Sequence, residues 1–119
     1  MAHVQNITVD PTKVPSDQGS DLSSAGIPLF YDLSNAGTTF WSTVANGGGD
    51  IRVFENDGVT ELPREVVSCD TATETGELHF LADHVDSVSD TVFQIHADGV
   101  SSDYAVDAAY GRDSVWVDY

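Results

Sequence analysis

The stretch DIRVFENDGVTEL, which runs from Asp50 to Leu62, indicates the fold more directly than any other part of the chain. Residues 50–55 and 59–62 are rich in β-branched and apolar side chains, which favour strands. Between them lies Asn56-Asp57-Gly58, whose residues accept the positive φ angles of a tight turn. The stretch therefore predicts a β-hairpin, and the proline that follows it favours a sheet edge or a bulge for the second strand.

Short strand-like segments lie on both sides of this hairpin. They cover residues 4–9, 27–33, 64–69, 77–82 and 91–97, and loops rich in Gly, Pro, Ser and Asp separate them. This spacing is typical of antiparallel sheets, and the chain lacks the long helical periods of parallel sheets with crossover helices. We predict an all-β protein: a single antiparallel, jelly-roll-like β-sandwich spanning residues 1–119 with one or two short helical turns. Residues 10–26 are read as a loop, and residues 115–119 as a β-prone end that can link to a following module.

Two segments interrupt this pattern with helical character. In residues 36–46, three apolar side chains recur at helical spacing and are expected to face the core. A second helical turn is expected near residues 104–109. The three apolar residues of the first segment are Phe40, Trp41 and Val44. The strand over residues 91–97 alternates instead, with Thr91, Phe93 and Ile95 on one face and Val92, Gln94 and His96 on the other.

The charge of the chain restricts its partners. Twenty acidic and four basic residues give the 119-residue chain a formal net charge of −16, which repels nucleic-acid phosphates and anionic lipid surfaces. No segment approaches the about 18 apolar residues of a membrane helix. We therefore expect neither nucleic acid nor membrane as a partner. The four basic residues are Lys13, Arg52, Arg64 and Arg112, and Arg52 and Arg64 are expected to pair with acids beside the hairpin.

The acidic composition fits two interpretations. One is a soluble, loop-rich β protein whose acids lie in turns and on the surface. The other is a halophilic or marine protein in which abundant cations screen the repulsion between carboxylates. Loss of the fold at low salt would indicate the second.

The sequence contains no motif for catalysis. Cys69 is the only cysteine, so no internal disulfide forms, and its apolar neighbours predict that it is buried. The chain has no Gly-x-Ser-x-Gly motif for a serine nucleophile. Its histidines lack the short paired spacing of zinc ligands. We therefore expect a protein that is not an enzyme. The histidines are His3, His79, His84 and His96.

Two kinds of binding residue remain as candidates. Calcium prefers carboxylate and carbonyl oxygens in loops, and the acidic loop residues that fit are Asp57, Asp98, Asp103 and Asp107. No other cofactor is indicated. Exposed aromatic rings can stack on sugars, and the side chains singled out for this role are Trp41, Tyr104 and Tyr110, with Trp116 and Tyr119 as further aromatics of the same kind.

The hairpin and its flanks resemble a known family of domains of unknown function. The family pattern is G-x-D-I-R-F-x-x-x-D-G-x-x-x-L-P-x-E-I, and this chain reads GDIRVFENDG over residues 49–58 and ELPREV over residues 61–66. Residues 6–10, 27–33, 90–95 and 115–119 are similar to the family's other segments in the same order. The chain departs from the family at His79-Phe80-Leu81, where Trp-Val is common, and at His96-Ala97-Asp98-Gly99, where Tyr-Tyr-Gly-Asn is usual.

The resemblance implies a β-sandwich without established catalytic residues, found in microbial surface proteins and phage structural proteins before laminin-G-type modules. The N-terminus MAHVQN does not read as a signal peptide. We therefore expect a virion structural protein of a phage or archaeal virus, such as a capsid decoration protein or tail component. It would be assembled in the host cytoplasm, with capsid or tail proteins or further copies of itself as partners. The alternative is a carbohydrate-binding or adhesion module of a microbial surface protein, located outside the cell or on its surface and bound to glycans.

Overall fold

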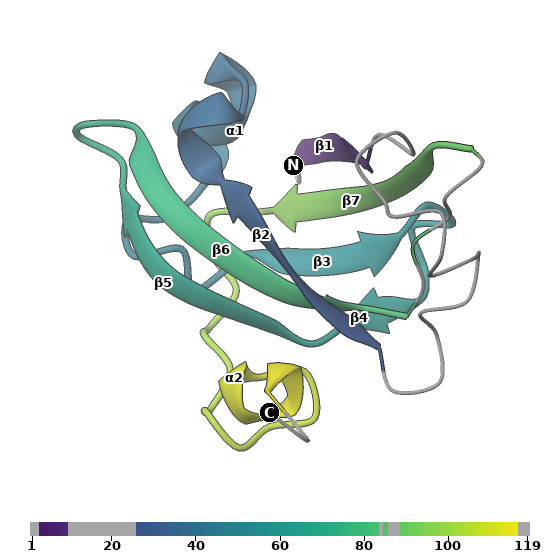
Figure 1. Ribbon diagram of the computed structural model, residues 1–119. Helices are drawn as coiled ribbons and strands as arrows, with labels where there is room; N and C mark the ends of the chain where they lie inside the picture. Colours follow the sequence, from purple (N-terminus) through teal and green to yellow (C-terminus); the bar gives the residue numbers. More distant parts are fainter. Residues whose placement is uncertain (1–2, 10–25, 84, 86–88, 117–119) are drawn as a thin grey trace.

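The computed structural model describes residues 3–9, 26–83, 85 and 89–116. These residues form two antiparallel sheets that lie one behind the other (Figure 1), which confirms the prediction of an all-β, sandwich-like fold. The four-stranded sheet has the order β1-β7-β3-β4, and the three-stranded sheet has the order β2-β6-β5. The strands are β1 His3–Val9, β2 Ile27–Asp32, β3 Arg52–Glu55, β4 Glu61–Leu62, β5 Arg64–Asp70, β6 Thr75–Ala82 and β7 Thr91–Ala97.

Helical structure in these ranges is short. A 3-10 turn, Leu33–Asn35, precedes α1, Thr38–Thr43, and α2, Arg112–Val115, follows the last strand. None of the described helices is long and apolar enough to cross a membrane. Most of the predicted loop at residues 10–26, including Lys13, lies outside the described residues.

The core lies between the two sheets and follows the predicted alternation of β7. Thr91, Phe93 and Ile95 are buried, whereas their neighbours on the opposite face are only partly buried. The ring of Phe93 meets that of Phe80 from β6 with centroids 5.1 Å apart, so this contact joins one sheet to the other. Large buried apolar side chains of this kind supply most of the free energy that favours folding.

The predicted helical segment is present as α1. Phe40, Trp41 and Val44 are buried as expected, and the first two rings meet edge to face with centroids 5.2 Å apart. The helix ends where Val44 takes up an extended backbone conformation. Gly48 then turns the chain at a φ of +72°, where an added Cβ would lie 2.9 Å from the Cβ of Cys69. Only glycine fits this position without strain.

The predicted hairpin is formed by β3 and β4. The Asp57 carboxylate closes its turn by accepting hydrogen bonds from the backbone N–H groups of Val59 and Thr60 and from the Thr60 hydroxyl. These bonds, those from Thr60 first, lower the pKa of Asp57. Gly58 completes the turn at a φ of +71°. The order of strand, turn and strand is therefore the one that the sequence indicates.

The first strand of the hairpin begins two residues later than predicted, because Asp50 is buried and bonded to segments outside the hairpin. Its carboxylate is only 2% exposed and accepts hydrogen bonds from the backbone N–H groups of Ala45, at 3.1 Å, and Gly99, at 2.6 Å. Asp50 thus joins the segment after α1 to the segment after β7. A buried carboxylate is stable when such donors satisfy it.

Arg64 holds the same region from the neighbouring sheet. The residue is 3% exposed, and its Nε donates to the Ile51 carbonyl at 2.8 Å. Its Nη2 donates to the Gly49 carbonyl at 3.0 Å and to Asp103 Oδ1 at 2.9 Å. The expected pairing of this arginine with an acid is confirmed, although the acid comes from the loop after β7.

Arg52 supports that loop in a different way. Its guanidinium donates to the Gly49 carbonyl at 2.8 Å and to the Ser102 carbonyl at 2.6 Å. It also lies over the ring of Tyr104, 4.0 Å from the ring centroid, as in a cation–π contact. The Tyr104 hydroxyl donates to Glu61 Oε2 at 2.6 Å. The loop after β7 is therefore attached to the hairpin at several points.

Two predictions for the C-terminal part are wrong. Residues 105–111 form turns closed by the hydrogen bonds Ala108 N to Ala105 O and Gly111 N to Ala108 O, and the helix begins only at Arg112. The chain turns here because its backbone binds β5, through the Arg64 N–H and the Tyr110 carbonyl. Val115, expected to be β-like, ends α2 and is fully buried, so packing overrides its strand propensity. Residues 117–119 lie outside the described residues.

Replacing Arg64 should destabilise the protein strongly. In Arg64→Met the carbonyls of Gly49 and Ile51 and the carboxylate of Asp103 lose their donor, so we expect the free energy of unfolding to fall by about 3 kcal/mol. Urea denaturation followed by tryptophan fluorescence measures this.

Arg112→Met is the matched control for this substitution. Arg112 pairs with Asp113 at 3.1 Å, and both side chains are about half exposed, at 51% and 54%. Its loss should cost less than about 1 kcal/mol. Equal effects of the two substitutions would contradict the role assigned to Arg64.

Candidate functional site

The outer face of the three-stranded sheet carries a row of side chains set by strand register. Phe30 of β2 lies opposite His79 of β6, and His79 lies opposite Glu65 of β5. Directly opposed residues in antiparallel strands project to the same side. Because the next residue along β6, Phe80, is buried in the core, His79 and its two partners project outward.

Trp116 extends this row from the far end of the chain. It directly follows α2, and its indole Nε1 donates a hydrogen bond to Glu65 Oε1 at 2.8 Å. Its ring lies 5.4 Å from that of His79, and the His79 ring lies 5.4 Å from that of Phe30. The three rings Phe30, His79 and Trp116, called the aromatic row below, therefore form one continuous surface.

The aromatic row combines exposed apolar area with hydrogen-bond acceptors. Phe30 is 58% exposed and Trp116 is 38% exposed. The carboxylate of Glu77 lies 2.8 Å from His79 Nε2, and Glu65 holds the indole of Trp116. The rings are tilted relative to each other by 47° and 53°, so the surface is ridged rather than flat.

This arrangement suits a ligand that has both an apolar face and hydroxyl groups. The ring surfaces can cover C–H groups, as aromatic side chains do when they bury apolar area. A carboxylate accepts at about four lone-pair positions, and each of the two contacts named above uses one of them. The remaining acceptor positions of Glu65 and Glu77 can bind hydroxyl donors, which makes a sugar ring the simplest ligand that meets both requirements.

Of the aromatic residues considered from the sequence, Trp116 belongs to the aromatic row, whereas Trp41, Tyr104 and Tyr110 lie elsewhere. Trp41 is 6% exposed within the core, so it offers no surface for stacking, which corrects that candidate. The ring of Tyr104 is covered by Arg52, and its hydroxyl is bonded to Glu61. Tyr110 is 38% exposed, with its ring 6.2 Å from that of Tyr104. Tyr119 lies outside the described residues.

Three of the four calcium candidates form hydrogen bonds within the protein. Asp57 closes the hairpin turn, and Asp103 pairs with Arg64. Asp98 accepts hydrogen bonds from Val100 N, Ser101 N and the Ser101 hydroxyl, which lowers its pKa to about 2, the bonds from Ser101 having the largest effect. Asp107 is exposed. The described residues contain no group of three His, Cys, Asp or Glu side chains placed to hold a metal ion.

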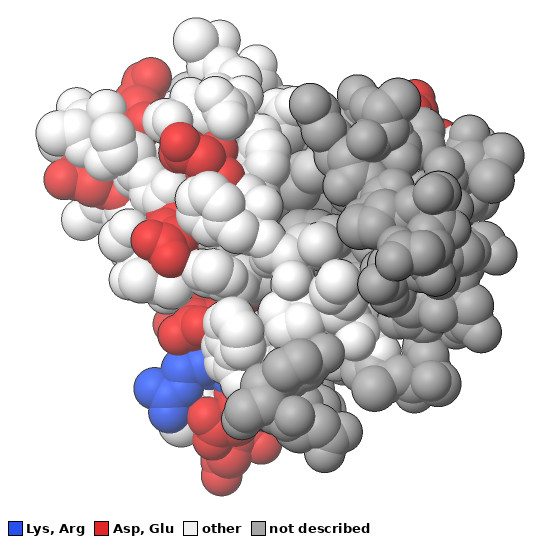
Figure 2. Space-filling view, in the orientation of Figure 1, with Lys and Arg blue, Asp and Glu red and all other residues white. Residues whose placement is uncertain are grey.

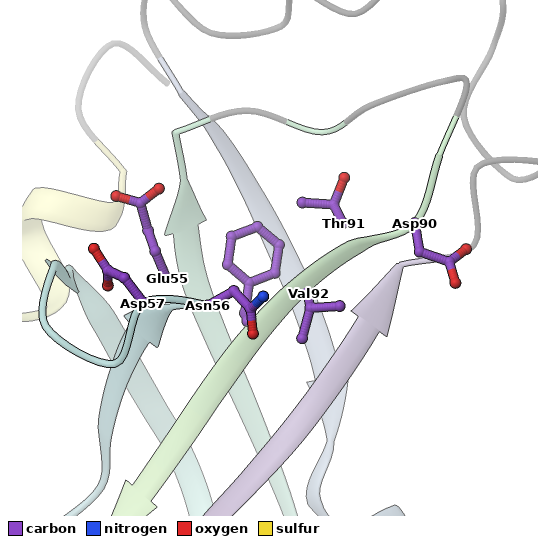
Figure 3. Close-up of a pocket in the computed structure, with 7 residues that line it drawn as sticks. Glu55, Asn56, Asp57, Asp90, Thr91 and Val92 are labelled. Carbon is purple, nitrogen blue, oxygen red and sulfur yellow. The ribbon is translucent and has the colours of Figure 1, made fainter.

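Three acidic residues border a hollow at the end of the hairpin. Glu55, Asp57 and Asp90 line an open depression of about 280 Å³ (Figure 3). In that view Glu55 and Asp57 lie on one side and Asp90 on the other. The carboxylates therefore border the depression without converging on one point, unlike the six to eight oxygen ligands of a calcium site.

The histidines occupy separate positions. His79 belongs to the aromatic row, whereas His96 packs on Phe54 with ring centroids 4.4 Å apart, and burial lowers its pKa. His3 lies on β1, and His84 lies outside the described residues. The described histidines are thus spread over both sheets.

Comparison of the chain with protein-family models, curated proteins and solved structures finds no match.

Sequence reasoning missed Phe30 and His79 and placed Trp116 only among the wider set of aromatics. The three residues are far apart in the chain, and a single aromatic in an apolar strand reads as core. The signal that could have found the site is the alternation in β2 and β6, combined with a hypothesis about which residues pair across the two strands.

Cys69 is predicted to be inert in the folded protein. Desolvation on burial, and then the charges of Asp50 and Asp70, raise the pKa of its thiol to about 11, so roughly one molecule in a thousand carries the reactive thiolate at pH 8. We expect negligible reaction with a thiol-specific chromogenic disulfide under native conditions and one thiol per chain in denaturant. Rapid native labelling would contradict the burial of this residue.

Proposed function

We propose that this protein is a non-enzymatic recognition module that binds carbohydrate through the aromatic row. The observation that carries the proposal is the exposure of Phe30 and Trp116 on either side of His79. The carboxylates of Glu65 and Glu77 lie beside these rings and can accept hydrogen bonds. Large aromatic side chains are normally buried when they serve only packing. Here Phe30 and His79 lie on paired strands of one sheet and Trp116 packs beside them, and a site built on strands is held more precisely than one built on loops.

The charges around the row favour a neutral or amino sugar. Glu65 and Glu77 are the acidic neighbours of the rings, and the whole chain carries a net charge of −16. An anionic sugar would be repelled by these carboxylates. A neutral sugar can instead donate hydroxyl groups to them, and such charge-assisted hydrogen bonds are the stronger kind.

Removing either exposed ring should weaken glycan binding. A broad array of neutral, amino and anionic glycans identifies the ligand, and titration calorimetry then measures its affinity. We expect Trp116→Ala and Phe30→Ala each to weaken binding at least about tenfold, equivalent to about 1.4 kcal/mol.

Tyr110→Ala is the matched control, because Tyr110 is as exposed as Trp116 but lies against Tyr104, outside the row. Its affinity should stay within about twofold of the unsubstituted chain, a change of about 0.4 kcal/mol. The proposal fails if no glycan on the array binds, or if Tyr110→Ala weakens binding as much as Trp116→Ala.

A virion structural role is the second candidate, and the distribution of charge supports it. Acidic side chains are spread over the described part of the face in Figure 2, whereas basic side-chain atoms are confined to one small patch at its lower left edge, beside acidic ones. A surface of this kind keeps particles dispersed through mutual repulsion. The resemblance of residues 49–66 to domains of phage structural proteins points the same way. Capsid or tail proteins would be the partners, and a decoration protein of this kind can also bind host glycans.

The virion role predicts where the protein is found. An antibody raised against the chain should detect it in density-banded virus particles released by the organism that encodes it, at a constant ratio to the main coat protein. Detection only in cell envelopes or culture medium without particles would instead place it among surface proteins and overturn the virion role.

A further inference from the structure

The sandwich has four sheet edges, and they differ in how well they are protected. The edge strands are β1 and β4 in one sheet and β2 and β5 in the other. An edge strand exposes backbone N–H and C=O groups that can pair with another chain, and proteins commonly block such edges with charges, prolines, bulges or short strands. The presence or absence of these devices therefore indicates where another strand can add.

Three of the edges carry such devices. The β4 strand is only two residues long and ends before Pro63. The β2 strand contains Pro28 and ends in Asp32. The β5 strand contains charged residues and a register irregularity between Val66 and Ser68, and its Arg64 N–H binds the loop after β7. Strand addition is disfavoured at each of them.

The β1 strand has none of these charges, prolines, bulges or short lengths. The α1 helix packs beside it, and Gln5 Oε1 of β1 accepts a hydrogen bond at 3.1 Å from the N–H of Gly37, the residue before that helix. The β1 sequence HVQNITV has no acidic residue, no lysine, no arginine and no proline, in a chain with 20 acids. All seven residues pair with β7 without a register shift, so the strand is regular along its whole length. Within the described part of the chain, the backbone–backbone hydrogen bonds of β1 are those to β7, and the Asn6 carbonyl also accepts from the Gln5 side-chain amide at 3.4 Å. The side chains of Val4, Asn6 and Thr8 are exposed on the outer face.

We propose that β1 pairs antiparallel with β1 of a second copy of this chain, so that two four-stranded sheets join into one continuous sheet. The charge of the protein favours a second copy at this edge, because two chains of net charge −16 can approach closely only where neither presents carboxylates. The strand is also suited to pairing with itself, since an antiparallel pair of identical strands has the two-fold symmetry of the commonest closed dimers.

The register of this pairing follows from the faces of the strand. The odd-numbered residues of β1 face the core. A two-fold axis perpendicular to the joined sheet keeps the core-facing side chains of both copies on the same side of that sheet. Odd-numbered residues of one copy must therefore lie opposite odd-numbered residues of the other. Full overlap of His3–Val9 then places Asn6 opposite Asn6 of the second copy. Val4 lies opposite Thr8 in this register. Shifting one copy along the other by two residues would remove two of the residue pairs between the strands.

A cysteine at the symmetry axis tests this register. In the proposed dimer the two Cα atoms at position 6 are about 4.5–5.5 Å apart, within disulfide range, whereas those at position 4 are about 14 Å apart and out of range. Under mild oxidation in molar salt, Asn6→Cys should therefore form at least about ten times more covalent dimer than Val4→Cys. The native Cys69 is buried and does not compete.

A lysine at the same position tests the dimer without cross-linking. Asn6→Lys places two like charges opposite each other and should raise the dimer dissociation constant at least about tenfold in light scattering at about 0.15 M salt, where the Debye length of about 8 Å leaves this repulsion largely unscreened. Val59→Lys adds the same charge at the exposed hairpin turn, where Val59 is 79% exposed, and should leave the constant unchanged. Circular dichroism confirms that both variants fold.

Three results would overturn the proposal. The unsubstituted chain could remain a monomer at every concentration in low and molar salt. Asn6→Cys and Val4→Cys could cross-link equally. A dimer could also persist unchanged in Asn6→Lys, which would place the interface on another surface. If the β1 edge instead received a strand from a different protein, the purified chain would remain a monomer, which is the first of these results.

Discussion

The buried guanidinium of Arg64 is the interaction on which the rest of this structure depends. Taking a cation out of water is costly unless its N–H groups find acceptors. Arg64 finds them in the carbonyls of Gly49 and Ile51 and in the carboxylate of Asp103. Since the first two directly precede β3 and the third lies after β7, one side chain of β5 links two segments that are distant in sequence to its own strand.

This anchoring determines where the C-terminal part of the chain can lie. The loop after β7 is held by Arg52, Arg64 and Asp50, and the chain then bonds along the edge of β5. The α2 turn follows directly, and Trp116 at its end reaches Glu65 on the outer face. The aromatic row is thus completed by a residue whose position depends on contacts made elsewhere in the fold. Asp50, Arg52 and Arg64, all within residues 49–66, thus form hydrogen bonds that support the loop after β7.

The two proposed surfaces belong to different sheets. The aromatic row lies on the outer face of the sheet β2-β6-β5, whereas β1 lies at the edge of the sheet β1-β7-β3-β4, as Figure 1 shows. Pairing through β1 would therefore extend one sheet without using the outer face of the other. A dimer of this kind would present two aromatic rows, and two linked sites bind a repeating ligand more tightly than one does.

Local sequence signals determined the position of several secondary-structure elements of this protein. Alternation predicted β7 and the division of its side chains between two faces, the residues Asn56-Asp57-Gly58 predicted the hairpin turn, and the helical spacing of Phe40, Trp41 and Val44 predicted α1. These elements are short-range, so the residues that specify them are neighbours in the chain. The predictions failed where long-range packing competes with local propensity, as at Val115, which is strand-like in composition and helical in the structure. The aromatic row was decided by tertiary structure alone, because strand register and the anchored C-terminal loop bring Phe30, His79 and Trp116 together, and neither can be read from residues adjacent in the chain.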